Sequence, residues 1–350
     1  MPAVIGLDIG HTSYRAAEVA YKKVAGVKKP VLTKALICEA CPDKDSKKSV
    51  ENLKEFIKSA NFDTKNVVLS LPESSVFTTI LSLPFKTDKE IKGYLDIQGS
   101  KIFPRPVSEL VYSFQNLGSS EQNKEETEVN VVACGKEYVE KLIETARAAG
   151  LKAVSVESDS FSIVRALTDG KTAVKGQNPR SNEAVLVVNV GSVGTDMMVI
   201  RKSNVRFSRN VSLGGDSFNR AIAQGLSITE IQADEYRKSY GLDAQLLDGK
   251  VRRALLPLAE TLINEIKRTM NFYLTRNTFC TFSRILYSGG AVTMPGLLSY
   301  SAEDLNIEVE LANPFVSLEF SSKIASQKEK LINLGPLYTV AVGLALKEIV

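Results

Sequence analysis

Two segments of this chain follow the same pattern, and this likeness limits the possible folds more than any other feature. They are Val4–Arg15 (VIGLDIGHTSYR) and Val185–Asp196 (VLVVNVGSVGTD). In each, an apolar run leads to Asp or Asn, then to an apolar residue, a glycine, a small polar turn and a second apolar run. The pattern predicts a buried strand that ends in a glycine-containing hairpin, whose backbone N–H groups can bind an anion. Two such hairpins facing each other would hold a polyphosphate from both sides.

The size and charge of the chain exclude some classes of protein. With 350 residues, 44% of them hydrophobic, the chain can bury a large core and divide into two or more domains. The net charge of +4 is small, whereas nucleic-acid binding usually needs a concentrated basic face. Lysines gather at Lys22–Lys29 and Lys44–Lys54, and we interpret them as solvated surface residues. We expect no nucleic-acid partner.

The cysteine and histidine content points to a reducing compartment. The four cysteines do not suggest a disulfide framework in a chain this long, and the lone pair Cys38 and Cys41 has no second pair to complete a metal site. The single histidine, His11, leaves no His/Cys cluster for zinc. No window approaches 18 apolar residues, and the N-terminus does not read as a signal segment. We therefore expect a cytoplasmic protein with free thiols.

The first half of the chain alternates predicted strands and helices. A second unit begins near Pro84, where helix, two strands and helix between flanking strands suit a small α+β insert. Residues Asp169–Asn182 are a polar, Gly-containing connector between the two halves. Periodicity and breakers predict helices at Ser49–Ala60, Asp88–Phe103, Glu137–Ala149 and Ser158–Leu167, and strands at Val67–Leu71, Leu110–Leu117, Glu128–Cys134 and Ala153–Val156.

The second half repeats this alternation. A strand at Ala184–Val190 leads through a hairpin to Val211, and helical patterns then dominate from Ser217 to about Phe282. An apolar strand at Arg284–Tyr287 runs into Ser288-Gly289-Gly290, and a helix is predicted over Leu337–Ile349. Strands alternating with helices in both halves predict an α/β fold with mixed sheets.

The first hairpin carries residues suited to phosphate and metal. The carboxylate of Asp8 stands just before the turn, where it could hold a hydrated Mg²⁺, because Mg²⁺ keeps several waters and is held through one or two carboxylates. His11, Thr12 and Ser13 would present N–H and hydroxyl donors to phosphate, and Arg15 would pair with its charge. The alternative is an ordinary hairpin at a domain edge with a solvated turn.

Three other segments extend the candidate site. The second hairpin supplies Gly191, Ser192, Gly194, Thr195 and Asp196. The Ser288-Gly289-Gly290 loop suits close approach by a ligand, although such glycine pairs also occur in ordinary turns. Glu157, at the start of a predicted helix, would orient water toward a γ-phosphate, or would only favour the helix N-terminus electrostatically.

Taken in order, these segments resemble a known family. The order is that of the actin/Hsp70/sugar-kinase superfamily, and more narrowly the chain is similar to the PilM family of type IV pilus assembly proteins, relatives of the division protein FtsA. The narrow matches are Lys101–Pro106 (KIFPRP), Glu265–Tyr273 (EIKRTMNFY), Met294–Leu297 (MPGL) and Glu310–Phe315 (ELANPF), with Gly214–Phe218 (GGDSF) and Val342–Ala345 (VGLA).

The resemblance implies a two-lobed actin-like fold, a duplicated ribonuclease-H-like α/β architecture with a small α+β insert. Lobe 1 would span 1–83, completed by 157–182 and 337–350; the insert would span 84–156, and lobe 2 would span 183–336 with a helical subdomain over about 217–282. ATP with Mg²⁺ is the implied cofactor. The residues implied to bind it are Asp8, Gly10, His11, Thr12, Ser13, Arg15, Asn189, Gly191, Ser192, Thr195, Gly214, Gly215, Lys267, Gly289 and Gly290, with Asp8 holding Mg²⁺ through water and Glu157 positioning water.

The resemblance also implies a partner and a place in the cell. PilM proteins dock the N-terminal cytoplasmic peptide of the membrane protein PilN, so we expect a PilN-like partner, other pilus platform proteins, and contact with the inner membrane only through these partners. The peptide groove is implied between lobe 1 and the insert, near Val76–Leu83 and Asp88–Phe103. An FtsA-like filament protein is the alternative, although we expect no membrane-binding tail after Val350. A sugar or acid kinase is a further alternative.

One residue departs from the family pattern. The second hairpin usually carries Asp where this chain has Asn189. An amide can hydrogen-bond a metal-bound water but adds no negative charge to offset Mg²⁺. We therefore expect the chain to bind ATP with slow or absent hydrolysis.

Overall fold

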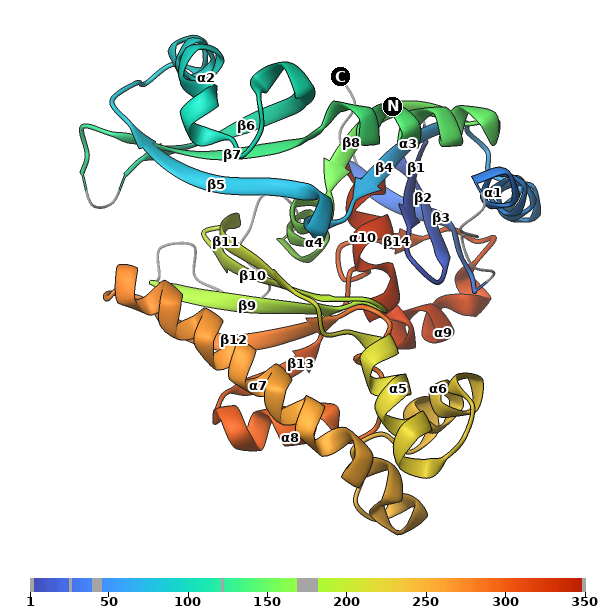
Figure 1. Ribbon diagram of the computed structural model, residues 1–350. Helices are drawn as coiled ribbons and strands as arrows, with labels where there is room; N and C mark the ends of the chain where they lie inside the picture. Colours follow the sequence, from blue (N-terminus) through green and yellow to red (C-terminus); the bar gives the residue numbers. More distant parts are fainter. Residues whose placement is uncertain (1–2, 25–26, 40–45, 121–122, 169–181, 348–350) are drawn as a thin grey trace.

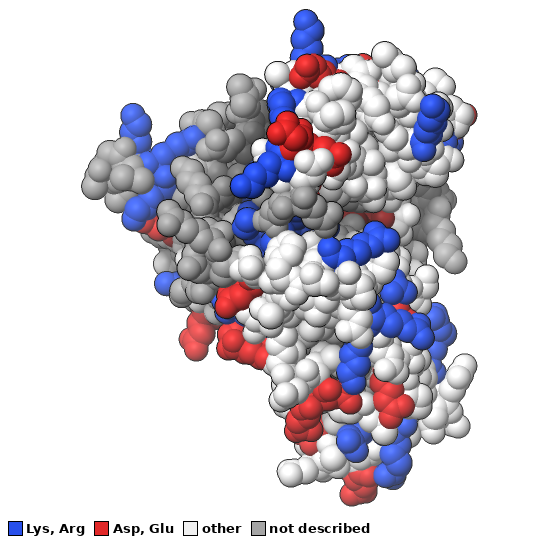
Figure 2. Space-filling model, turned by 90° about the vertical axis from the view of Figure 1, so that its left-hand side faces the viewer, with Lys and Arg blue, Asp and Glu red and all other residues white. Residues whose placement is uncertain are grey.

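The computed structural model describes residues 3–24, 27–39, 46–120, 123–168 and 182–347. Residues 169–181 of the predicted connector, Cys41, and the end of the predicted C-terminal helix lie outside this part. The fold is a mixed α/β arrangement in which the described strands form three sheets (Figure 1). On the face shown in Figure 2, acidic and basic side chains are interspersed, in line with the small net charge.

The lobe 1 sheet has the strand order β14-β3-β2-β1-β4-β8. β1, β2 and β3 are antiparallel neighbours, and β4 and β8 are added parallel to β1. The strands are β1 (Val4–Ile9), β2 (Tyr14–Val24), β3 (Val27–Cys38), β4 (Asn66–Leu71), β8 (Lys152–Ser158) and β14 (Glu319–Phe320). The helices that pack on this sheet are α1 (Ser46–Ala60), α3 (Lys136–Ala148), α4 (Asp159–Thr168) and α10 (Gly335–Ala345).

The lobe 2 sheet repeats the same arrangement, with the order β11-β10-β9-β12-β13. Again three antiparallel strands come first and two parallel strands are added to the first of them. The strands are β9 (Glu183–Val190), β10 (Thr195–Arg201), β11 (Asn204–Val211), β12 (Thr281–Ser288) and β13 (Glu308–Leu311). The helices of this part are α5 (Gly215–Leu226), α6 (Glu230–Ser239), α7 (Lys250–Arg276) and α8 (Leu297–Leu305), with the short 3₁₀ turn η3 (Leu246–Gly249). The 3₁₀ turn η4 (Ala325–Gln327) leads into α9 (Lys328–Asn333), which packs with α10 on the lobe 1 core.

A third, smaller sheet forms the insert. Its order is β5-β7-β6, all antiparallel, and α2 packs on its outer face (Figure 1). The elements are β5 (Val76–Leu83), α2 (Asp88–Ile102), β6 (Leu110–Ser119) and β7 (Thr127–Gly135), with 3₁₀ turns η1 (Glu73–Ser75) and η2 (Val107–Glu109). Thr87 and Glu90 form a capping box that starts α2, and the helix stops before Phe103-Pro104 as the sequence predicts.

The two lobes share a core. On β9, Ala184, Leu186 and Val188 point to one apolar cluster, whereas Val185 and Val187 point to another. A strand buried on both faces explains the continuous apolar run in the sequence. The second cluster also includes Ile163 of α4 and Val340 and Leu344 of α10. These two helices lie between the two large sheets (Figure 1).

Candidate functional site

The turn after β1 and the turn after β9 meet at one pocket. Each is closed in the same way: the Gly10 N–H donates to the Ser13 carbonyl at 3.0 Å, and the Gly191 N–H donates to the Gly194 carbonyl at 2.9 Å. The pocket encloses about 130 Å³. It is lined by Asp8, Gly10, His11, Arg15, Pro72, Glu73, Ser74, Asp159, Asn189, Gly191, Ser192, Gly194, Asp196, Asn210, Gly289, Pro336, Leu337 and Val340.

Close backbone approach shapes the second side of the pocket. Gly289 has φ +93°, and a Cβ there would lie 2.3 Å from the Val190 carbonyl oxygen, so only glycine fits. The N-terminus of α5 supports the second turn from behind, because the Gly215 N–H donates to the Gly191 carbonyl at 2.9 Å. A Cβ at Gly214 would lie 2.5 Å from the Ser192 carbonyl oxygen. Gly214 and Gly215 therefore hold the turn without lining the pocket.

Four carboxyl groups line the pocket, and two of them, Asp8 and Glu73, each accept hydrogen bonds from two neighbouring side chains. Asp8 accepts from Arg15 Nη1 at 3.0 Å and from Ser70 Oγ at 3.2 Å. Glu73 accepts from Ser160 Oγ at 2.6 Å and from Ser158 Oγ at 3.2 Å. These bonds offset part of the cost of burying charged groups.

The other two carboxyl groups, those of Asp159 and Asp196, have raised pKa values. Burial raises the pKa of Asp159 well above its usual range, and the carboxylates of Asp8, Asp196 and Glu73 raise it further. Its Oδ1 atom is buried and has no hydrogen-bond partner within the described residues. Burial also raises the pKa of Asp196 to about 6, against the opposing hydrogen bond from Asn210. A cation in the pocket would stabilise the charged form of both carboxyl groups.

Asn189 and Asp196 stand directly opposite each other on β9 and β10. The Asn189 amide donates to Asp196 Oδ2 at 3.2 Å, and Asn210 donates to Asp196 Oδ1 at 2.6 Å. In lobe 1 the corresponding opposite pair is Asp8 and Arg15. The second hairpin thus keeps a carboxylate in the pocket, but on the returning strand.

Not every residue implied by the resemblance lies in the pocket. Asp8, Gly10, His11, Arg15, Asn189, Gly191, Ser192 and Gly289 line it. The rest of those named for the two turns and the glycine loop (Thr12, Ser13, Thr195, Gly214, Gly215 and Gly290) belong to the same segments but do not line it. Lys267 lies on α7, half-exposed, in an ion pair with Asp304 at 2.5 Å.

The structure places Glu157 outside the pocket. β8 continues to Ser158, so α4 begins two residues later than its predicted carboxylate, at Asp159. Glu157 forms an ion pair with Arg165 through two contacts of 2.5 and 2.7 Å and accepts from Lys347 at 3.1 Å. Burial acts to raise the pKa of Glu157, but Arg165 and Lys347 outweigh it and hold that pKa below its usual value. Asp159 occupies the pocket position expected of Glu157.

The resemblance alone did not assign Glu73, Asp159 and Asp196 to the site. Glu73 follows Leu71-Pro72 at the carboxyl end of the parallel strand β4, an end of α/β sheets where ligands commonly bind. Asp159 lies two residues after Glu157 and is the first residue of α4. Asp196 is the last residue of the second repeated segment. No three Asp, Glu, His or Cys side chains among the described residues are arranged to ligate a metal directly.

A second hollow of about 340 Å³ lies between the insert and lobe 1. β6 and β7 form one wall and β8 with α4 the other; none of its described lining residues comes from β5 or α2, where the resemblance implied a groove. Apolar side chains dominate, and the Glu157–Arg165–Lys347 cluster lies among its lining residues. The lining residues are Leu71, Val111, Tyr112, Ser113, Phe114, Gln115, Asn130, Val132, Cys134, Val139, Val156, Glu157, Ser158, Phe161, Arg165 and Lys347.

Comparison with known proteins identifies the family. The model of the type IV pilus assembly protein PilM family matches residues 6–349. The chain belongs to the PilM family. Members of this family are type IV pilus assembly proteins. Within the described residues, no helix combines the length and the apolar character needed to span a bilayer.

Solved structures show the same fold. The structure of a PilM–PilN type IV pilus biogenesis complex is 23% identical, with 98% of this chain and 97% of that chain covered and a TM-score of 0.82. The ethanolamine utilization protein EutJ from Carboxydothermus hydrogenoformans is 14% identical, with coverage of 99% and 90% and a TM-score of 0.56. MreB5 of Spiroplasma citri bound to AMPPNP is 13% identical, with coverage of 98% and 95% and a TM-score of 0.51. The two-lobed actin-like fold of this PilM family member is therefore established.

Proposed function

We propose that this PilM family member is a nucleotide-binding assembly protein of the pilus inner-membrane complex, and that it docks a peptide of a PilN-like partner. The observation that supports it most is the pocket where the two repeated turns meet. The solved MreB5 structures contain ADP and AMPPNP, and the solved PilM structure contains PilN. Those ligands motivate the two binding roles proposed here.

The pocket suits the phosphate end of ATP. Its volume is below the roughly 300–1,000 Å³ of pockets that take whole small-molecule ligands. Arg15 lines the pocket, and its buried Nε is a donor that lacks a hydrogen-bond partner in the described part of the chain; a phosphate oxygen would satisfy it. The base would lie outside, beyond Gly289 and Gly290. The contact of Lys267 with the base, which the resemblance implies, stays a prediction.

The carboxyl groups suit a hydrated Mg²⁺. Asp8, Asp159 and Asp196 would hold its waters, because a hydrated ion needs hydrogen-bond acceptors and no set of three direct protein ligands. When bound, Mg²⁺ would offset the charge of the triphosphate and of these carboxylates. Asp159 is the better placed of the two candidates to orient an attacking water, since Glu157 lies outside the pocket. With Asn189 in place of Asp, we propose that hydrolysis is slow or absent.

The nucleotide proposal is tested by titration calorimetry with Mg²⁺ and ATP. Asp8→Ala should abolish binding, because it removes a pocket carboxylate and leaves Arg15 without its partner. Asp63→Ala, which removes an exposed carboxylate elsewhere in lobe 1, should bind as the unmodified chain does. Equal binding by both variants, or none by the unmodified protein, would refute the proposal.

The hollow between insert and lobe 1 is proposed as the peptide groove. Most of its lining residues are apolar, and it is also lined by the buried Asn130, whose Oδ1 lacks a hydrogen-bond partner among the described residues. An extended peptide could bury apolar side chains there and donate to this oxygen. Binding of the N-terminal segment of a PilN-like protein would place this chain at the cytoplasmic face of the membrane, beside the other platform proteins.

Two exposed valines give a matched test of the groove. Val111 is 47% exposed and lines the groove, whereas Val316 is 56% exposed and lies elsewhere. Val111→Asp should abolish binding of a fluorescent PilN N-terminal peptide, and Val316→Asp should leave it unchanged. Both should bind ATP normally. Equal peptide affinity in the two variants would place the peptide on another surface.

A further inference from the structure

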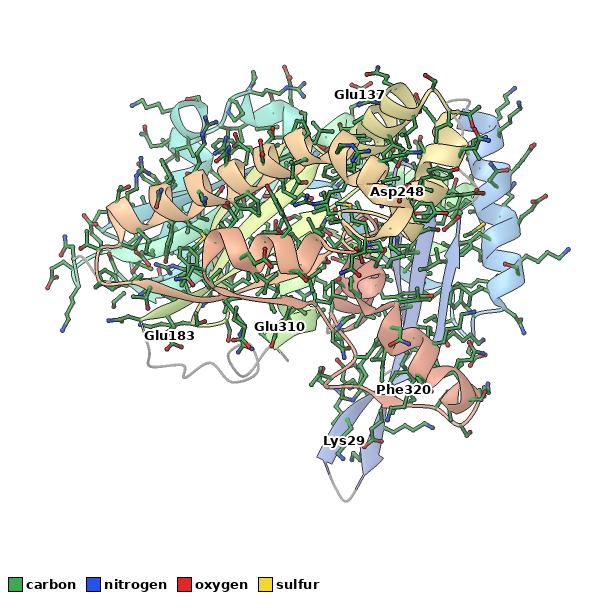
Figure 3. The ribbon with its side chains drawn as sticks, turned by 90° about the horizontal axis from the view of Figure 1, so that it is seen from below. Lys29, Glu137, Glu183, Asp248, Glu310 and Phe320 are labelled. Carbon is green, nitrogen blue, oxygen red and sulfur yellow. The ribbon has the colours of Figure 1, made fainter. Side chains whose placement is uncertain are left out.

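The hairpin of β2 and β3 continues past the rest of its sheet. The pairing of β1 with β2 ends at Val4 opposite Val19, whereas β2 and β3 stay paired as far as Val24 opposite Val27. β14 adds only to Val31 and Leu32. Within the described residues, Tyr21–Val24 and Val27–Pro30 therefore have only each other as strand partners. Figure 3 shows this two-stranded ribbon, labelled at Lys29, extending away from the body of the molecule.

Four exposed lysines lie on this ribbon in two cross-strand pairs. Lys22 is opposite Lys29, and Lys23 is opposite Lys28. Successive residues of a strand point to opposite faces, so each face of the ribbon carries one lysine pair. Lys29 forms an ion pair with Glu319 at 2.9 Å, and Lys28 lies over the ring of Tyr21 at 4.6 Å from its centroid.

This arrangement costs stability. Like charges directly opposite each other on an antiparallel pair are destabilising, and a two-stranded ribbon has little packing to offset the cost. The ribbon is also remote from the nucleotide pocket. β1 enters the sheet beside the base of the ribbon and reaches Asp8 at its other end. The pocket therefore does not need these lysines, and the two like-charge pairs do not stabilise the ribbon.

We propose that the lysine ribbon binds the anionic phospholipid surface of a membrane. Lysine is a compact, flexible point charge that binds phosphate without the fixed geometry of arginine. A cluster of four to eight basic residues is the size that anionic lipid surfaces attract, at about 1 kcal/mol per residue near the surface. Contact with the membrane is then direct as well as through partners.

The charge distribution favours lipid over a protein or nucleic-acid partner. A folded protein or a duplex would meet one face of the ribbon and leave the lysine pair of the other face unused. A layer of lipid headgroups can contact both faces of a projecting ribbon and so meets both lysine pairs. Nucleic-acid recognition usually adds arginine or exposed aromatic rings, and Tyr21, the aromatic residue described on the ribbon, is already covered by Lys28.

The base of the ribbon lies close to one end of α10, beside a residue that lines the proposed groove. The Tyr21 hydroxyl donates to the Leu346 carbonyl at 3.2 Å, and the next residue, Lys347, lines the groove. The ribbon and one wall of the groove therefore meet at the end of α10. The lipid proposal does not depend on this proximity, and it is tested without peptide or nucleotide.

The test is co-sedimentation of the full chain with vesicles. Binding is expected to vesicles of equal parts phosphatidylcholine and phosphatidylglycerol and not to phosphatidylcholine alone, and to weaken as salt rises from about 0.05 to 0.5 M. The triple variant Lys22→Gln, Lys23→Gln, Lys28→Gln should bind on the order of a hundredfold more weakly, which corresponds to about 1 kcal/mol per lysine. Lys29 is kept because of its ion pair with Glu319.

Two further variants separate charge position from net charge and from folding. Lys54→Gln, Lys58→Gln, Lys250→Gln removes the same charge from exposed lysines outside the ribbon and should bind vesicles as the unmodified chain does. Lys22→Arg, Lys23→Arg, Lys28→Arg should keep binding. Equal loss in the two glutamine variants, no binding of the unmodified chain to anionic vesicles, or binding only to nucleic acid or to an acidic protein would overturn the proposal.

Discussion

At the scale of single residues, the two hairpins differ in where they carry negative charge. Asp8 stands on the outgoing strand in lobe 1, opposite Arg15, whereas in lobe 2 Asn189 takes the outgoing position and Asp196 faces it. The pocket therefore holds one carboxylate from each hairpin, although their positions are not equivalent. These two carboxylates, with Asp159, are the groups that would hold the waters of a hydrated metal ion.

Restoring the carboxylate tests this asymmetry. Asn189→Asp should raise the ATP hydrolysis rate several-fold, because a second anion on the outgoing strand would fix the hydrated metal more firmly. Without ligand the same change should lower stability by about 1–2 kcal/mol, since the new charge faces Asp196. The measurements are steady-state phosphate release and chemical denaturation, with Asn189→Ala as control. An unchanged rate would mean that the amide does not limit turnover.

The pKa of Asp196 predicts a pH dependence. Its pKa is raised to about 6 in the folded protein, so the folded state binds more protons than the unfolded state between about pH 4 and pH 6. The stability that the protonated form contributes is present at low pH and lost as pH rises through 6. Asp196→Asn should therefore be more stable than the unmodified chain at pH 8, by up to about 3 kcal/mol, and similar at pH 4.

Denaturation curves at the two pH values, without nucleotide, provide the measurement. Glu303→Gln, at an exposed residue of α8, is the control for a carboxyl-to-amide change outside the pocket. A stability gain for Asp196→Asn that is equal at both pH values would contradict the assignment.

The site shows how far single residues can be predicted from sequence. Both turns, with Asp8, Arg15, Asn189 and Gly191, were expected together and line one pocket. From the sequence, Glu157 was expected at the start of the helix; the structure shows that β8 runs on to Ser158, so the first carboxylate of α4 is that of Asp159. Glu73 is joined to the pocket only by the packing of β4 between β1 and β8, which the local sequence does not encode.

At the scale of elements, α10 is held by two very close contacts. A Cβ at Gly343 would lie 1.8 Å from the Ser162 carbonyl oxygen of α4, and a Cβ at Gly6 of β1 would lie 1.9 Å from the Ala341 carbonyl oxygen. Backbone atoms on both sides leave no room for a methyl group. These glycines let α10 approach both α4 and the central strand of lobe 1.

Gly343→Ala is expected to be severely destabilising. The added methyl group would force α10 away from α4, at a cost of about 3 kcal/mol or more. Gly93→Ala is the matched control: Gly93 lies within α2 with nothing close to its added Cβ, so the change should stabilise by about 0.5–1 kcal/mol. Thermal and chemical denaturation measure both. A small or favourable effect at Gly343 would mean that the helices do not cross this closely.

Long elements were predicted within a few residues, and short ones were missed. The predicted helices at Ser49–Ala60 and Asp88–Phe103 form over Ser46–Ala60 and Asp88–Ile102. β14 was not predicted, because a two-residue strand has no periodicity and exists only through its parallel pairing with β3. Its pairing also brings a segment from the second half of the chain into the lobe 1 sheet.

At the scale of the whole molecule, the lobes and the insert are joined differently. The lobes share the apolar cluster between the two large sheets, so separating them would expose buried Val187, Ile163 and Leu344. The insert has its own core around Ile91, Leu95 and Val131. Its boundaries at Pro84 and Val156 stay a prediction, although β5 already belongs to the insert sheet before Pro84 and α3 packs on lobe 1.

The insert contacts lobe 2 mainly through polar groups. Arg206 pairs with Glu128, the Asn130 side chain donates to the Val205 carbonyl at 3.2 Å, and Gln115 donates to Asn204 at 3.1 Å. A small hollow lined by Arg206 and Asn130 lies at this junction. Such a junction is weaker than the shared apolar cluster of the lobes. The apolar contact of the insert with lobe 1 is a small cluster around Leu71, Cys134 and Val139, so the insert should open without the lobes unfolding.

Native-state hydrogen exchange measures this difference directly. Amides of β5, β6 and β7 should open with a free energy at least about 2 kcal/mol below that of β1 and β9. Arg206→Gln should lower the value for the insert further and leave the lobes unchanged, because it breaks the ion pair that joins the insert to lobe 2. Arg284→Gln, which removes an ion pair with Glu310 within lobe 2, is the control. If all three sheets exchange with one common free energy, the insert is an integral part of the lobes, and peptide binding in the groove would then have to act on the whole molecule at once.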